Sequence, residues 1–362
     1  MASIITPLTA PADVAETPLP GAHKHLSPNQ RAWLRFKRNR VGYVALWVFV
    51  GMLIISTLAE LIANDRPFVA RYEGRWYVPM IHNPTDRELG GDFDTEVDWH
   101  DPFIRTNLAK TGNFALFTLI DHSARSVNNF ALEADPARPS SDHRLGTDES
   151  GRDLLARLIY GFRVSVWFGF ALMLTGIAIG LLAGAVQGYF GGRIDLAGQR
   201  FIEIWNSIPE LYLLIIFASI FEPSILLLLI LLSLFGWVSL SDYVRAEFLR
   251  NRGLEFVKAA RALGLSNWQI IWRHVLPNSM TPVITFLPFR MSAAILALTS
   301  LDFLGLGVPS PTPSLGDLLR QGKENLDAWW ITVPTFAVLV LTLLLLTLIG
   351  DALRDAFDTR KS

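Results

Sequence analysis

Long apolar runs recur along this chain, and they constrain its fold more than any other feature. Lipid offers no water to bond backbone N–H and C=O groups, so a run that enters it must form a helix or a closed barrel. A helix rises ~1.5 Å per residue, so about 20 apolar residues cross the ~30 Å hydrocarbon core. The chain is 51% hydrophobic and only 18% charged. We therefore expect an all-α membrane protein with six transmembrane helices, at residues 41–63, 164–186, 198–221, 224–243, 281–304 and 331–350.

Basic residues set the predicted orientation and the division of the chain. Several arginines and a lysine directly precede the first run, and short cytoplasmic segments are enriched in such residues. Both termini are then cytoplasmic. We expect a cytoplasmic N-terminal tail at 1–40 (disordered over 1–28), a first transmembrane helix at 41–63, a small exterior, periplasmic insert at 64–145 with a hairpin at 71–78, a five-helix core at 146–353, and a cytoplasmic tail at 354–362.

A polar segment at 254–277 interrupts the core on the predicted cytoplasmic side. Its first part suits a helix with Phe256, Ala259, Ala260 and Leu263 on one face, ended by Gly264. A second helix follows, with these features: an N-cap at Ser266, a capping box with Gln269, an apolar stripe of Trp268, Ile271, Trp272 and Val275, and an end at Pro277. Spacing alone leaves two interpretations open, a docking element for a partner or a connector lying on lipid headgroups.

The same segment resembles a family signature. The sequences KAARALG and HVLP are similar to the EAA motif of binding-protein-dependent ABC importer permeases, in which this helix couples the membrane subunit to a cytosolic ATPase. Lys258 stands where glutamate is usual, which reverses the charge of one contact, and His274 replaces a branched apolar residue. The resemblance implies that the ATPase-coupling residues are Lys258, Ala259, Ala260, Gly264, Leu276 and Pro277.

Further stretches extend the resemblance over most of the chain. Residues 145–166, 301–319 and 350–358 are similar to dipeptide and oligopeptide permeases, and 60–80 to the microcin C and oligopeptide importer subgroup. This implies a type I ABC importer permease fold in the bacterial inner membrane, carrying peptides. The implied partners are a second homologous permease subunit, cytosolic ABC ATPases, which would bind the ATP and Mg, and a periplasmic peptide-binding protein.

The sequence indicates no chemistry of its own. The chain has no cysteine, and its Gly322-Lys323 pair lacks the glycine spacing of a phosphate loop. The histidines are scattered, so no metal site is predicted. Asp148, Glu149 and Asp153 precede the second run and are interpreted as the solvated start of a helix in preference to a metal or catalytic site. A net charge of −1 argues against nucleic-acid binding. We expect a non-catalytic subunit without a cofactor.

Ionisable residues within apolar runs are costly and therefore informative. Arg290 lies inside the fifth run, which we expect Pro288 to interrupt. Arg290 either lines the pathway or pairs structurally with an acid such as Glu203, Glu210 or Asp302. The predicted pathway residues are Arg290, Asp302 and Glu203.

Three alternative functions fit part of the sequence. An importer for another solute, such as nickel or dipeptides, would share the same motifs. An ion-driven secondary transporter would show inverted repeats and midplane carboxylates, and no repeat is apparent. A membrane-anchored sensor would need a cytoplasmic output domain.

Overall fold

The computed structural model describes residues 27–127 and 134–358, and its membrane part is helical, as predicted. The expectation of disorder over most of 1–28 lies outside the described residues. Among the described residues, five helical stretches are long and apolar enough to span a membrane, and a bent pair makes six if it crosses as one. The stretches are α2 (Arg40–Thr57), α5 (Leu154–Phe190), α8 (Ile225–Gly236) with α9 (Val238–Asn251), α11 (Asn267–Ile270) running through η2 (Ile271–Val275) into α12 (Leu276–Phe303), and α14 (Trp329–Phe357).

The second span is longer than predicted at both ends. Its helix α5 starts at Leu154 because the Asp153 side chain accepts a hydrogen bond from the backbone N–H of Ala156 at 2.8 Å. It continues to Phe190, where Gly191 ends it with a positive φ of 63°. With 37 residues, the helix is ~55 Å long, so it extends well beyond the hydrocarbon core.

The third span is broken rather than continuous. Helices α6 (Gly192–Asn206) and α7 (Glu210–Ile220) meet at an angle of 60°. The break lies at Pro209, which cannot donate a backbone hydrogen bond and precedes the first residue of α7. Glu210 therefore lies at a helix N-terminus part-way along the span.

The predicted interruption of the fifth span is wrong. The chain is helical from α11 to the end of α12, and Pro277, Pro282 and Pro288 all lie within this stretch. Membrane helices tolerate proline where local π turns and hydroxyl side chains compensate the freed backbone groups. Here the π turn η2 comes directly before α12.

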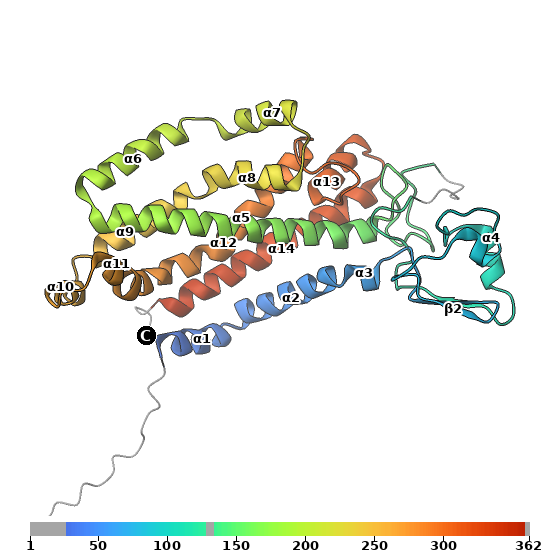
Figure 1. Cartoon of the computed structure of the whole chain (residues 1–362), viewed down its shortest axis with the longest axis horizontal. Helices are drawn as coiled ribbons and strands as arrows, with labels where there is room; N and C mark the ends of the chain where they lie inside the picture. The colour runs from blue at the N-terminus through green and yellow to red at the C-terminus, as the bar shows by residue number, and fades with distance from the viewer. Residues whose placement is uncertain (1–26, 128–133, 359–362) are drawn as a thin grey trace, which may run out of the picture.

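The helices place different segments at the two ends of the molecule (Figure 1). One end, called here the α10 end, holds α10 (Glu255–Ala262), α11, the last turn of α14 and α1 (Pro28–Arg38). There Phe36 of α1 packs on Ala352 and Ala356 of α14. The opposite end, the insert end, holds the segment after α3 (Ala59–Ile62) and α13 (Leu315–Glu324).

The insert is a small mixed subdomain. Strands β1 (Val69–Tyr72), β2 (Arg75–Tyr77) and β3 (Phe114–Leu116) form an antiparallel sheet in the order β2-β1-β3. The predicted hairpin is confirmed, with Glu73 and Gly74 both at positive φ in its turn. Short helices η1 (Asp86–Leu89) and α4 (Pro102–Leu108) cover a core built around Trp99.

Helices α5 and α9 share the most extensive contact in the bundle. Four glycines spaced four residues apart, Gly176, Gly180, Gly184 and Gly188, form a stripe along α5, and this glycine stripe faces α9 and the end of α8. A Cβ on Gly180 would lie 2.7 Å from the Trp237 carbonyl oxygen. Small residues at this spacing let two helix backbones pack directly against each other in a membrane. The sequence analysis missed this regular signal.

Substituting one of these glycines should therefore loosen the bundle. We expect Gly180→Ala to lower stability by about 1–3 kcal/mol, because the added methyl overlaps backbone atoms that cannot turn away. Thermal denaturation of the purified protein in detergent measures this as a lower Tm. Gly51→Ala is the matched control, since no atom lies within 4 Å of the Cβ it would add. Equal Tm values for the two variants would contradict the close contact.

Candidate functional site

The polar segment at the α10 end folds into two short helices joined by a tight turn. Helix α10 ends in a Schellman motif: Gly264 has a φ of +81°, its N–H bonds the Arg261 carbonyl, and the Leu265 N–H bonds the Ala260 carbonyl. The predicted capping box follows. Ser266 Oγ accepts from the Gln269 N–H at 3.3 Å, and Gln269 Oε1 accepts from the Ser266 N–H at 3.0 Å. These predictions are confirmed.

Three of the four residues that we placed along one face of α10 lie on its exposed side. Val257 and Ala260 are the buried residues, while Phe256, Ala259 and Leu263 are exposed. The helix is turned in this way because Val257 and Ala260 belong to one core with Val244 and Phe248 of α9 and Val275 of η2. The apolar part of α10 that remains outside therefore forms a surface that no described residue of the chain covers.

The stripe predicted for the second helix is only half correct. Ile271 and Val275 are buried, but Trp268 and Trp272 are exposed and pack against each other edge to face. Pro277 does not end this helix, as described above. The second helix is instead the first part of α12, so any displacement of α11 is passed directly to a membrane span.

Tyr189 near the end of α5 holds this element in place. Its hydroxyl donates to Asn267 Oδ1 at 2.9 Å and accepts from Arg261 Nη2 at 3.4 Å. Arg252, just before α10, donates to the Tyr189 carbonyl at 3.3 Å. The two short helices are thus bonded to α5, packed against α9 and continuous with α12.

The six residues of the predicted coupling motif divide into two groups. Ala260 and Leu276 face the protein core, whereas Lys258, Ala259, Gly264 and Pro277 are exposed. Lys258 donates to Glu255 Oε1 of its own helix at 2.8 Å. The lysine that stands in place of the usual glutamate therefore has an acidic partner on the same surface. We call Glu255, Phe256, Lys258, Ala259 and Leu263 the α10 surface.

A second site lies within the bundle. A cavity of about 230 Å³ is lined by α5, α7, α8, α9 and α12, and it has Glu210 and Arg290 on its wall. The Arg290 guanidinium donates to the carbonyl of Gly236, the last residue of α8. A cation at a helix C-terminus satisfies a carbonyl that lacks a helical partner. Of the two roles left open for Arg290, structural pairing would have used an acid, and the partner found here is this backbone carbonyl instead.

The other two predicted pathway residues lie elsewhere. Glu203 is exposed on α6 and pairs with Arg200 at 2.6 Å. Asp302 is buried near the end of α12, where it accepts hydrogen bonds from the Val308 N–H at 2.7 Å and from the Ser314 hydroxyl. Asp302 thus holds the loop before α13, and the structure does not bring the three residues together.

The sequence interpretation of a solvated helix start is wrong for two of the three acids before α5. Asp148 and Asp153 are 0% and 1% exposed. Asp148 pairs with Arg157, which is itself 0% exposed, at 3.1 Å, and with Arg152 at 2.8 Å. Arg157 also reaches Asp317 of α13 at 3.4 Å. Charges survive burial only when paired in this way.

Glu149 differs from its two neighbours because it stays partly exposed. Partial burial raises the pKa of its carboxyl, although the nearby Arg320 guanidinium acts in the opposite direction.

The chain of ion pairs from Asp148 through Arg157 to Asp317 joins the start of α5 to α13. An arginine three residues after the start of an apolar helix was a signal for this pairing that the sequence analysis did not use.

Comparison with known proteins decides the family. A family model described as "Binding-protein-dependent transport system inner membrane component" matches residues 176–362, about half of the chain. The chain belongs to this family. A second model, the "N-terminal TM domain of oligopeptide transport permease C", matches residues 27–84. The resemblance to importer permeases is confirmed.

Several curated relatives of this binding-protein-dependent permease are similar over nearly their whole length. The "Inner membrane ABC transporter permease protein YejE" of Escherichia coli K12 is 47% identical over 338 residues, covering 93% of this chain and 99% of that protein. The "Peptidoglycan transport system permease protein YejE" of Agrobacterium fabrum is 43% identical, covering 92% and 93%. The "Dipeptide transport system permease protein DppC" of Haemophilus influenzae is 31% identical, covering 96% and 99%.

The buried ion chain at the insert end gives a prediction for this permease. We expect Arg157→Met to cost about 3–5 kcal/mol, because it leaves the buried Asp148 with one partner fewer. Arg163→Met is the control on the same helix: Arg163 pairs with a half-exposed Glu60, and such pairs contribute about 0–1 kcal/mol. Thermal unfolding and the yield of monodisperse protein measure both. Similar losses in the two variants would contradict the special role of Arg157.

Proposed function

We propose that this chain is one of two membrane subunits of an ATP-driven importer of peptides. The observation that carries the proposal is the α10 surface, an apolar and charged face that is held against α5 and α9 and that the described residues leave uncovered. In the proposed assembly a cytosolic ATPase covers it. This chain would bind no ATP or Mg and catalyse no reaction.

The geometry supports a mechanical role for α10. A partner that moves α10 also moves Tyr189 and Phe248, because both contact the two short helices. The glycine stripe makes α5 and α9 one tightly packed pair, so the displacement passes along both. ATP binding can shift the transporter between states only if the ATPase interacts more favourably with one of them. The α10 surface is where we place that preference.

The proposed membrane orientation follows from the two ends of the molecule. We place the α10 end, with both termini, in the cytoplasm and the insert in the periplasm of a bacterial cell. Basic residues around 31–40 and 245–273 support this orientation. A periplasmic peptide-binding protein would then dock at the insert end, and a homologous permease subunit would complete the transporter.

The substrate class rests on the relatives and on the cavity. Relatives named for dipeptide and peptidoglycan transport favour peptides over nickel. A cavity with Glu210 and Arg290 on its wall has one charge for each terminus of a peptide. An ion-driven transporter would have no use for an ATPase-docking surface, and the family of this chain argues against that alternative.

The first test replaces a small residue of the α10 surface with a large one. We expect Ala259→Trp to weaken ATPase copurification from native membranes at least about tenfold, equivalent to 1.4 kcal/mol of binding free energy. Ala259 is exposed, so the fold should survive. Ala109→Trp, at an exposed position in the insert, is the matched control. Undiminished ATPase binding by the Ala259 variant would contradict the proposed docking surface.

The second test separates the two roles of Arg290. We expect Arg290→Ala to lower peptide uptake at least about tenfold while the yield of the complex stays normal. Loss of the bond to Gly236 is offset by removal of a guanidinium that is costly to bury in a membrane. Uptake of a labelled tripeptide and complex yield are measured together, with Arg200→Ala as the exposed control. Low yield with normal uptake per complex would assign Arg290 a purely structural role.

A further inference from the structure

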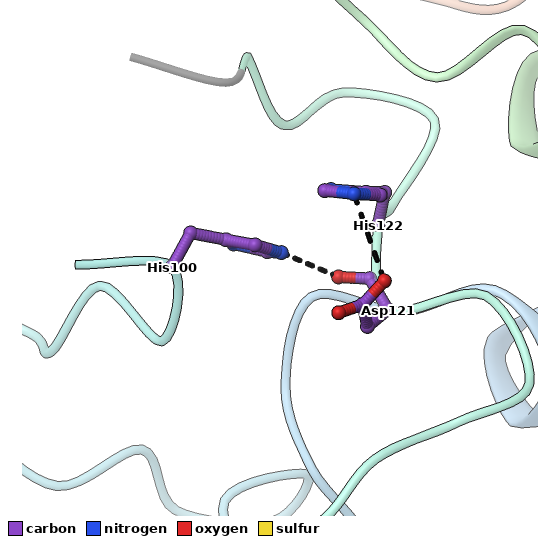
Figure 2. A group of neighbouring side chains, drawn as sticks. All are labelled: His100, Asp121 and His122. Atoms are coloured by element: carbon purple, nitrogen blue, oxygen red, sulfur yellow. Dashed lines mark hydrogen bonds and ion pairs between the residues drawn. The ribbon is translucent and has the colours of Figure 1, made fainter. Parts of the chain in front are cut away.

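Two segments of the insert bring two imidazole rings and a carboxylate together (Figure 2). His100 follows the core residue Trp99, while Asp121 and His122 come after β3. One ligand atom from each of the three side chains lies within 4.8 Å of the others. Imidazole nitrogen and carboxylate oxygen are the donors that Zn²⁺ and related divalent ions bind. Their separation in the sequence gave no sign of this cluster.

The carboxylate of the cluster is already oriented. Arg105 Nη2 donates to Asp121 Oδ2 at 2.7 Å, which leaves Oδ1 on the side of His122, with Oδ1 and Nε2 3.6 Å apart. Carboxylates that bind metals are commonly hydrogen-bonded through their other oxygen. Arg105 thus holds Asp121 in a position from which one oxygen can bind an ion.

His122 is fixed by its surroundings. It is 5% exposed and stacked between the rings of His100 and His143, with centroid distances of 4.5 and 4.3 Å. His143 Nδ1 lies 3.0 Å from Asp153, the residue that caps α5. The cluster therefore lies between the insert and the first turn of a membrane helix, and an ion that held its side chains in place would connect the two.

One ring must turn before both histidines can bind the same ion. The rings of His100 and His122 are nearly parallel, at 10°, so their nitrogen lone pairs do not meet at one point. His100 is the ring that can turn, because it is less buried and borders a polar cavity of about 260 Å³. Its Nε2 would exchange the Asp121 carbonyl, now 2.6 Å away, for the ion.

A partner for the other nitrogen of His100 is also present. Nδ1 lies 3.6 Å from Asp98 Oδ1. A metal-bound histidine usually donates its second N–H to a carboxylate or a carbonyl. A small shift of the ring would bring Nδ1–H within hydrogen-bond distance of Asp98, and that tautomer would leave the Nε2 lone pair able to bind an ion.

We propose that the insert binds one divalent transition-metal ion of the Zn²⁺ class through His100 Nε2, Asp121 Oδ1 and His122, with water completing the coordination. The bound ion joins the segment before α4 to the segment after β3. Through the ring of His143 it also reaches the start of α5. The ion is a structural element of the insert and does not depend on what the transporter carries.

The test uses the full chain, purified in detergent and stripped with a chelator. Equilibrium dialysis against Zn²⁺ alone, read by elemental analysis, should give one ion per chain. Co²⁺ should give visible absorption bands of nitrogen and oxygen coordination. We expect His100→Gln to weaken binding at least about 100-fold, since loss of a supporting partner alone costs about 10–100-fold. His82→Gln, an exposed histidine of the same insert, should bind as the unchanged chain does.

The outcomes decide the proposal in either direction. Asp121→Asn is the second variant, and it serves if the His100 variant aggregates during size-exclusion chromatography. Stoichiometric binding that both ligand variants lose and the His82 variant keeps supports the site. No stoichiometric binding by the unchanged chain overturns it. Equal binding by all variants means an adventitious ion only, and also overturns it.

Discussion

The direct packing of α5 on α9 is the contact on which the rest of the structure depends. Within a bilayer there is no hydrophobic effect to drive helices together, so close backbone approach must supply the attraction. The glycine stripe provides that approach over roughly three turns of α5. The same two helices carry Tyr189 and Phe248, which hold α10 and α11. The tightly packed α5–α9 pair therefore runs through the bundle and holds the α10 surface at one of its ends.

The two ends of this pair are built differently. At the α10 end, short helices with exposed side chains attach through a few hydrogen bonds and one apolar core. At the insert end, α5 starts inside a buried network in which Arg157 contacts Asp148 and Asp317. Such a network is costly to break once formed. We interpret the first end as the place where force enters and the second as the place where the helix is anchored to α13.

The spacing of apolar residues and the positions of turn and capping residues predicted the helical fold, the hairpin, and the turn at Gly264 and Ser266. These features depend on residues that are close together in the sequence. Features set by tertiary contacts were not predictable in the same way. The face that α10 buries depends on Phe248 of another helix, so Val257 is inside and Phe256 outside. The prolines of α12 do not break it, and a π turn comes just before the first of them. The partner of Arg290 is a backbone carbonyl, which no sequence pattern reveals.

Photo-crosslinking from Ala259 tests the central claim most directly. The chain has no cysteine, so Ala259→Cys accepts one photoreactive label without further changes. In membranes with an active transporter, irradiation should give one major adduct with the mass of this chain plus an ATPase. The same label at Ala109 of the insert should give none. An active transporter in which Ala259 yields no ATPase adduct would contradict the view that a separate motor acts on the α10 surface.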